Sequence, residues 1–276
     1  DSGRGILPQI KIFTENFMQE VALSVQNLKK QFRLSYKQQK LQHTDKKVLT
    51  AVDGLSFTAY RGEIFGLLGP NGAGKTTTLR MLATLISPDS GDAIVEGFSI
   101  VKQPAEVRSR IGFLTGELKL EDFFTPNYLF NFFCDLYGVD GAVRAQRKRQ
   151  LFSRFGIDRF AEVKLANLST GMKQKVSLVI SVVNDPEFII FDEPTNGLDV
   201  LTAKTVTDFL LELKAQGKTI ILSTHIFSLV EKICDRVGVI IDGKLAALDT
   251  VANITREKNL EDVFFDIYAR TAGGAI

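Results

Sequence analysis

The sequence predicts an α/β fold with a mostly parallel sheet and an inserted helical part. Three short apolar stretches, residues 63–68, 188–191 and 218–224, have the length of buried strands, and each runs into polar residues that precede a helical pattern. Strands that alternate with helices are typical of a parallel sheet. Residues 117–180 carry apolar side chains at steps of three and four, which indicates helices.

Size, composition and charge narrow the class of protein before any motif is considered. The 276 residues, 45% of them hydrophobic, are enough for one large domain or for a domain with a subdomain. The net charge of +2 gives no electrostatic reason to expect a nucleic-acid partner. The longest apolar runs have about five residues, whereas a membrane helix needs about 20. We therefore expect a soluble globular chain, in which Cys134 and Cys234 are buried reduced thiols.

The strongest motif is GPNGAGKT at residues 69–76, which matches the phosphate-binding pattern G-x-x-x-x-G-K-[ST] in full. Its glycines would let backbone N–H groups surround phosphate oxygens. Lys75 would reach the β- and γ-phosphates, and the Thr76 hydroxyl would bind Mg²⁺. A chance glycine loop is the alternative, but the flanking strand and helix patterns favour the phosphate loop. The predicted ATP-binding residues of this loop are Gly69, Pro70, Asn71, Gly72, Ala73, Gly74, Lys75, Thr76 and Thr77.

A second motif, FIIFDEPTNGLD at residues 188–199, ends a buried strand with two adjacent acids, Asp192 and Glu193. Adjacent carboxylates at the edge of a core are costly unless a cation or a reacting group engages them. We therefore expect Asp192 to bind Mg²⁺ and Glu193 to polarise the water that attacks the γ-phosphate. A solvated turn acid at each position is the alternative. Asp199 is expected to be the N-cap of a helix at residues 200–216.

His225 follows the third apolar stretch and stands at the carboxyl end of that predicted strand. Ligands of open parallel sheets gather at those ends, so His225 should lie at the same edge as Lys75 and Glu193. A local helix cap explains this histidine equally well.

LSTGMKQK, residues 168–175, begins another helix. Ser169 is a good N-cap, and Gly171 leaves the first turn bare. A helix start with open N–H groups and two nearby lysines can hold an anion, but an ordinary cap explains the same residues. This stretch by itself leaves both interpretations open.

These motifs resemble those of the ATP-binding subunit of an ABC transporter, and they occur in that family's order: GPNGAGKT, LSTGM, FDEP, GLD and His225. The resemblance covers about residues 21–248. It implies a P-loop NTPase core, with a mostly parallel sheet and an antiparallel β subdomain, and a helical subdomain at about residues 117–184. It also implies an ATPase that uses ATP and Mg²⁺ on the cytoplasmic face of the cell membrane. The implied partners are a transmembrane permease and a second ATP-binding subunit, and finer matches such as LEDVF at residues 260–264 resemble export-type subunits.

The resemblance also implies roles for single residues. Phe32 resembles the aromatic residue that stacks on the adenine, with Tyr36 as the alternative. Ser169 and Gly171 match the signature that completes the ATP site of the other subunit. His225 matches the switch histidine at the γ-phosphate. The implied catalytic residues are thus Glu193, His225 and Lys75.

Residues 21–270 are expected to form a single domain between an N-terminal appendage, residues 1–20, and a C-terminal tail, residues 271–276. Residues 33–48 look like an insertion between the first two strands, and we expect their lysines to lie on a solvated hairpin. Two positions depart from the family: Gly116 stands where the family usually has Gln, so no side chain there can contact magnesium, and Met172 stands where the signature usually ends in Gln.

Most of the apolar residues at helical spacing in the predicted helical part should pack in its local core, and the resemblance adds that some should border a groove for a coupling helix of the permease. A soluble ABC ATPase that acts in translation or DNA repair is the alternative function, but neither a second cassette nor a coiled coil is visible. A regulatory module that binds ATP without hydrolysis is disfavoured by the four predicted site residues Lys75, Asp192, Glu193 and His225. The apolar residues that should pack in the local core or border the groove are Phe124, Tyr128, Leu129, Phe132, Phe133, Leu136 and Tyr137.

Overall fold

The computed structural model describes residues 20–41, 45–115 and 121–271. The predicted appendage before Glu20, the tail after Thr271 and the predicted departure at Gly116 therefore lie outside the described residues. Among the helices of the described ranges, none is long and apolar enough to cross a bilayer. Cys134 and Cys234 are buried and unpaired, as predicted.

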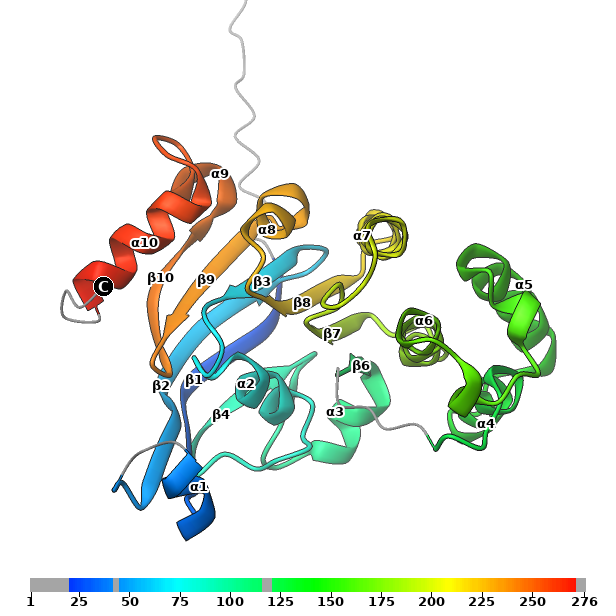
Figure 1. Ribbon diagram of the computed structural model, residues 1–276, viewed down its shortest axis with the longest axis horizontal. Coiled ribbons are helices and arrows are strands. Elements are labelled where there is room, and N and C mark those ends of the chain that lie inside the picture. Colours follow the sequence, from blue (N-terminus) through cyan, green and yellow to red (C-terminus); the bar gives the residue numbers. More distant parts are fainter. Residues whose placement is uncertain (1–19, 42–44, 116–120, 272–276) are drawn as a thin grey trace, which may run out of the picture.

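A six-stranded sheet forms the centre of the molecule, in the order β10-β9-β3-β8-β7-β6 (Figure 1). All neighbours are parallel except β10, which pairs antiparallel with β9. The three apolar stretches of the sequence are β3, β7 and β8, so their prediction as strands is confirmed. The strands are β3 (Ile64–Leu68), β6 (Ile111–Leu114), β7 (Phe188–Asp192), β8 (Thr219–Thr224), β9 (Arg236–Ile241) and β10 (Lys244–Thr250).

A second sheet of four antiparallel strands, in the order β2-β1-β4-β5, packs against the first. The ring of Phe57 on β2 stacks on that of Phe65 on β3 at 5.1 Å. β1 and β2 pair as far as Arg33 and Val48, and the short helix α1 (Tyr36–Leu41) lies in their connection. The expected hairpin at residues 33–48 therefore contains a helix. The strands are β1 (Val21–Arg33), β2 (Val48–Tyr60), β4 (Ser90–Val95) and β5 (Phe98–Ser99).

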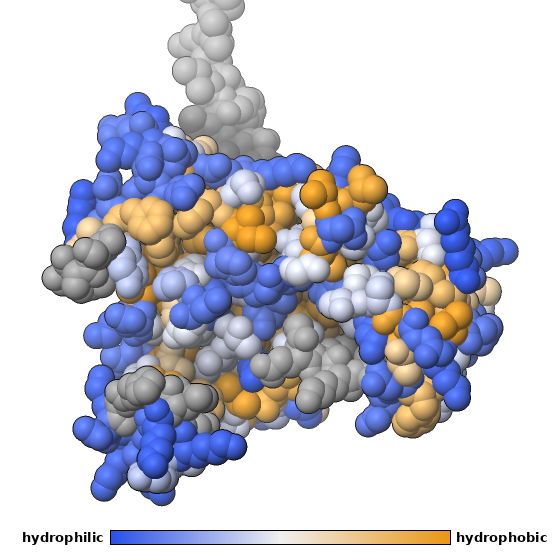
Figure 2. All heavy atoms as spheres, in the orientation of Figure 1, coloured by the Kyte–Doolittle hydropathy of each residue, from blue (hydrophilic) through white to orange (hydrophobic). Residues whose placement is uncertain are grey.

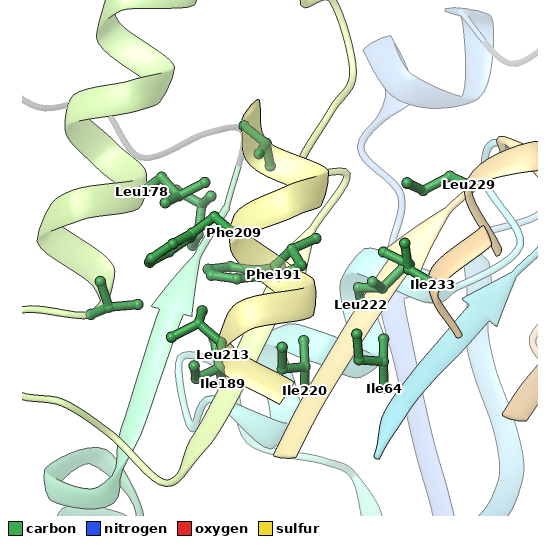
Figure 3. Packing of buried hydrophobic residues seen from close by; sticks show 14 of the residues in the cluster. Ile64, Leu178, Ile189, Phe191, Phe209, Leu213, Ile220, Leu222, Leu229 and Ile233 are labelled. Carbon is green, nitrogen blue, oxygen red and sulfur yellow. The ribbon is translucent and has the colours of Figure 1, made fainter. Parts of the chain in front are cut away.

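The central strands are buried on both faces, which explains why their sequences are continuously apolar. On β7, Ile189 and Phe191 face a core formed with α6, α7 and α8, whereas Phe188 and Ile190 face the antiparallel sheet. Figure 3 shows Ile189 and Phe191 beside Phe209 and Leu213 of α7 in the first of these cores. Both β3 and β7 therefore deliver the residues that follow them to one edge of the sheet.

Helices α4, α5 and α6 come between β6 and β7 in sequence: α6 packs against β6 and β7, and α4 and α5 lie farther out, beyond the β6 edge of the sheet (Figure 1). α7 begins at the predicted N-cap, because Asp199 accepts hydrogen bonds from the N–H groups of Leu201 and Thr202, each at 3.0 Å. Two 3₁₀ turns, Ile157–Phe160 and Leu165–Asn167, precede α6. The helices are α2 (Lys75–Leu82), α3 (Pro104–Arg110), α4 (Pro126–Leu136), α5 (Gly141–Phe155), α6 (Thr170–Ser181), α7 (Val200–Ala215), α8 (Phe227–Ile233), α9 (Val251–Ile254) and α10 (Leu260–Thr271).

Candidate functional site

The glycine-rich loop connects β3 to α2 and is pressed against neighbouring backbone. A Cβ atom at Gly69 would lie 2.3 Å from the carbonyl oxygen of Ile240, and one at Gly74 would lie 2.2 Å from that of Ala51. Gly74 is the N-cap of α2 and has a φ of 101°, and no side chain forms a capping hydrogen bond at this helix start. Both positions therefore require glycine, and the first turn of α2 begins without a side chain over it.

Lys75, the first residue of α2, folds back over the loop. Its Nζ donates to the carbonyl oxygens of Gly69 at 2.7 Å and Pro70 at 3.1 Å, and it lies 3.6 Å from Oε1 of Glu193. Burial lowers the pKa of Lys75, and the charges of Glu193 and Asp192 oppose that shift. The Lys75 side chain is 6% exposed, and the one ion pair it forms among the described residues is with Glu193. Its ammonium would therefore stabilise an additional anion in the loop.

Asp192 ends β7 and accepts two hydroxyl hydrogen bonds on one oxygen. Thr76 Oγ1 donates to Asp192 Oδ1 at 3.0 Å, and Ser223 Oγ on β8 donates to the same oxygen at 2.5 Å. Among the described residues, no group of three or more His, Cys, Asp or Glu side chains could hold a metal alone. A hydroxyl beside a carboxylate does suit Mg²⁺, which keeps waters and takes one or two protein oxygens with the phosphates of a substrate.

Glu193 follows directly and holds a backbone conformation that is uncommon for a residue with a side chain, with a φ of 49°. Its Oε1 lies 3.1 Å from Nδ1 of His225, so His225 joins this site and does not act as a local helix cap. Its Oε2 is buried and has no hydrogen-bond partner among the described residues. A buried carboxylate oxygen without a partner is typical of a position that a water or ligand occupies. Neither acid is a solvated turn residue, since both side chains are largely buried.

Lys75, Thr76 and Glu193 line one hollow of about 260 Å³. Asp192 and His225 do not line it but contact its lining residues Thr76 and Glu193. Phe32 borders it, whereas Tyr36 does not and is 72% exposed. The sequence analysis missed Asn196, Leu49 and Ala51 in the lining, and Ser223 behind it. Of these residues, Ser223 has the clearest signal in the sequence, because it is a polar residue near the end of an apolar strand. The lining residues are Phe32, Leu49, Ala51, Asn71, Gly72, Ala73, Gly74, Lys75, Thr76, Thr77, Glu193 and Asn196.

The start of α6 lies elsewhere and does not line this hollow. Ser169 caps the helix by accepting from the N–H of Met172 at 3.3 Å. Lys173 is paired with Asp122 at 2.9 Å. A Cβ at Gly171 would meet no atom within 4 Å. Figure 1 shows α6 apart from α2, so the structure does not bring Ser169 and Gly171 together with the other predicted site residues.

The predicted apolar residues in α4 and immediately before it divide between the core and the surface. Leu129 is buried, and Phe124 and Phe133 pack against the core. Tyr128 and Phe132 are about half exposed. A local helical core therefore accounts for only some of the apolar spacing.

Comparison with known proteins agrees with this geometry. A family model described as "ABC transporter" matches residues 52–196. The ABC transporter ATP-binding protein NatA of Bacillus subtilis is 40% identical over 229 residues, which are 82% of this chain and 93% of NatA. The Nod factor export ATP-binding protein I of Ralstonia nicotianae is 38% identical over 198 residues, which are 72% of this chain and 62% of that protein.

The fold is also that of a solved ATP-binding cassette, MJ0796, whose dimeric structure is described as a post-hydrolysis state bound to ADP and Pi. The two superpose with a TM-score of 0.73 at 22% sequence identity, over 83% of this chain and 98% of that chain. The α/β P-loop core that the resemblance implied is thereby confirmed. The chain belongs to the ABC transporter family, as an ATP-binding subunit with ATPase activity.

Proposed function

We propose that this chain binds MgATP in the hollow at the start of α2 and hydrolyses it to drive export through a separate membrane permease. The observation that carries the proposal is the convergence of Phe32, Lys75 and Glu193, from three distant parts of the sequence, on one partly buried hollow, with Asp192 hydrogen-bonded to the lining residue Thr76. Backbone N–H groups of the loop and the ammonium of Lys75 would hold the phosphates. Phe32, at the opening of the hollow, would stack on the adenine.

Thr76 and Asp192 would hold Mg²⁺, which when bound neutralises charge on the phosphates. Glu193 would accept a proton from the attacking water. Its Oε2 has no partner among the described residues, whereas Oε1 is engaged by His225 and lies near Lys75. His225 would thus hold the base in place while its 40% exposed ring remains able to contact the γ-phosphate.

Among the described residues, none from the start of α6 lines the hollow of the same chain. Ser169 and Gly171 on α6 match the signature that the family uses on the opposite side, and Ser169 is exposed. A helix start presented to an anion supplies charge-assisted N–H contacts. We therefore assign these residues to the ATP site of a second subunit, in a dimer that buries two nucleotides. The dimeric form of the MJ0796 cassette supports this assignment.

The permease is assigned to a groove beside α4. A hollow of about 190 Å³ lies between the end of α2, β6 and the α4 and α6 helices, and Phe133 and Tyr137 are among its lining side chains. The exposed ring of Phe132 lies 5.5 Å from that of Phe133. Figure 2 shows apolar side chains among the hydrophilic ones on the lobe that α4 and α5 form.

An apolar groove of this kind fits an amphipathic helix of a partner. Docking there would place the subunit on the cytoplasmic face of the membrane. The direction of transport follows from the resemblance to export-type subunits and from the name of the Nod factor export relative.

The dimer provides the test of this function. Glu193→Gln should bind ATP but not hydrolyse it, so it should accumulate an ATP-dependent dimer that light scattering detects, with ADP leaving the protein monomeric. Wild-type protein with the same nucleotides is the control. Turnover of ATP by Glu193→Gln at the wild-type rate would contradict the assigned base. A mass that does not change with nucleotide, either alone or in the complex with the permease, would contradict the dimer.

A further inference from the structure

We propose that Ser223 is a positioning residue for both carboxylates of the ATP site, and that it links the predicted metal ligand Asp192 to the predicted base Glu193. The inference rests on the proposed function, because it assigns a role beside residues to which that function gives the chemistry. Ser223 belongs to none of the sequence motifs and does not line the hollow. Its side chain is 0% exposed, so it acts through its neighbours and not on the substrate.

The register of the sheet places Ser223 directly beside the two acids. β7 and β8 are parallel, and Asp192 is the partner of Ser223 across the two strands. At this point β7 ends, and the chain turns so that Glu193 also faces Ser223. One serine can therefore contact the side chain of Asp192 and the backbone of Glu193.

Ser223 uses three of its hydrogen-bonding capacities on these two residues. Its Oγ–H donates to Asp192 Oδ1 at 2.5 Å. The same Oγ accepts from the N–H of Glu193 at 3.2 Å. The carbonyl oxygen of Ser223 accepts from that N–H as well, at 3.1 Å. The hydroxyl therefore stands between a side-chain acceptor of one acid and a backbone donor of the other.

Glu193 needs such an anchor because its backbone is in the left-handed region, with a φ of 49°. A residue with a side chain holds this conformation only when its surroundings over-determine it. The two hydrogen bonds to Ser223 fix the N–H of Glu193 at the turn. They thereby direct its carboxylate towards His225 and Lys75.

Asp192 needs an anchor for a different reason. Thr76, the other donor to its Oδ1, is itself a predicted ligand of Mg²⁺. When the Thr76 oxygen is engaged by a metal, Ser223 remains as a donor that has no other task in the site. Without this remaining hydrogen bond the carboxylate of Asp192 would be free to rotate away from the position that suits the metal.

Ser223 could instead be purely structural, as a buried hydroxyl that only needs a hydrogen-bond partner. A positioning role predicts that a variant loses magnesium-dependent affinity and turnover, whereas a purely structural role predicts a change in stability alone. We would measure the affinity for a non-hydrolysable ATP analogue with EDTA and with Mg²⁺, together with turnover and thermal unfolding. The variants are Ser223→Ala and the nearly isosteric Ser223→Cys, whose thiol is a weak donor. Ser181 is a matched control, because it is also buried and donates only to the helix carbonyl of Leu178, at 2.7 Å.

Both Ser223 variants should bind the analogue in EDTA as the wild type does. The gain in affinity that Mg²⁺ gives should fall about tenfold, since one hydrogen bond to a charged group is worth about one decade in binding. Turnover should fall at least as much, while Ser181→Ala and Ser181→Cys should keep both values. If Ser223→Ala fails to fold, the cysteine variant supplies the same comparison.

An unchanged magnesium gain in a folded Ser223 variant would overturn the inference and leave the proposed function intact. The same would follow if the Ser181 variants lost as much as the Ser223 variants. A wild-type protein that gains no affinity from Mg²⁺ would instead overturn the proposed metal site, and the inference with it.

Discussion

The starts of α2 and α6 are both helix N-termini with glycine in or next to the first turn, yet their surroundings are opposite. α2 begins after Gly74 in a left-handed conformation, without a side-chain cap, and its first residue is buried. α6 begins after Ser169 in an extended conformation, and the serine caps it. The N-terminus of α2 is therefore surrounded by residues of its own chain, whereas that of α6 is exposed.

The difference shows what makes a helix start a binding site within one chain. The N–H groups of a first turn favour anions at either helix. At α2 the loop, a buried lysine and two acids complete the surroundings. At α6, Ser169 caps the first turn and Lys173 is held in an ion pair with Asp122, so we expect the rest of any anion site there to come from another molecule.

The largest expected effect is that of Lys75→Ala, which should reduce ATP turnover on the order of 1,000-fold because it removes the ammonium beside the β- and γ-phosphates. The fold should remain, since Lys75 donates only to loop carbonyls and lies near one acid. Phosphate release and circular dichroism are the measurements. Lys204→Ala, on the exposed face of α7, is the control. Turnover close to that of the wild type would show that α2 is not the phosphate site.

Gly74 at the start of α2 and Gly171 at the start of α6 allow the same substitution to be compared at the two helix starts. Gly74→Ala should lower the free energy of unfolding by roughly 3 kcal/mol, because its Cβ would lie 2.2 Å from a backbone oxygen and its φ is positive. Gly171→Ala should change it by less than about 1 kcal/mol, since nothing lies within 4 Å and alanine favours a helix. Chemical denaturation measures both. Equal losses would mean that the two starts are equally constrained.

The exposed start is tested by Ser169→Arg in the Glu193→Gln background. The arginine should weaken the ATP-dependent dimer by about 30-fold, as expected when a central interface position is blocked, and leave ATP binding by the monomer nearly unchanged. Light scattering and nucleotide titration separate these two quantities. Ser153→Arg, at an exposed serine of α5, is the control. A double variant that still dimerises would show that α6 faces something else.

The smallest expected effect concerns the opening of the buried site. Phe32→Ala should weaken ATP binding by about 1 kcal/mol through lost stacking. Tyr36→Ala should have no effect, because the ring of Tyr36 does not line the hollow. Calorimetric titration of ATP against both variants is the measurement. If Tyr36→Ala weakened ATP binding and Phe32→Ala did not, the residue that stacks on the adenine would be Tyr36.

The sequence by itself determined the elements whose reasons are local. The strands β3, β7 and β8 were predictable because a strand buried on both faces must be apolar throughout, and the phosphate loop because its glycines and lysine are contiguous. The cap at Asp199 was predictable for the same reason, since a capping side chain bonds within three residues of itself.

Only the tertiary structure decided the contacts between distant segments. Residues 33–48 allowed a hairpin, and the structure places α1 in it. His225 could have been a helix cap, but the register of parallel strands brings it to Glu193. The bond from Ser223 to Asp192 spans 31 residues and depends on which strands are neighbours in the sheet. Strand order follows from how the whole core packs, and no short stretch of sequence contains that information.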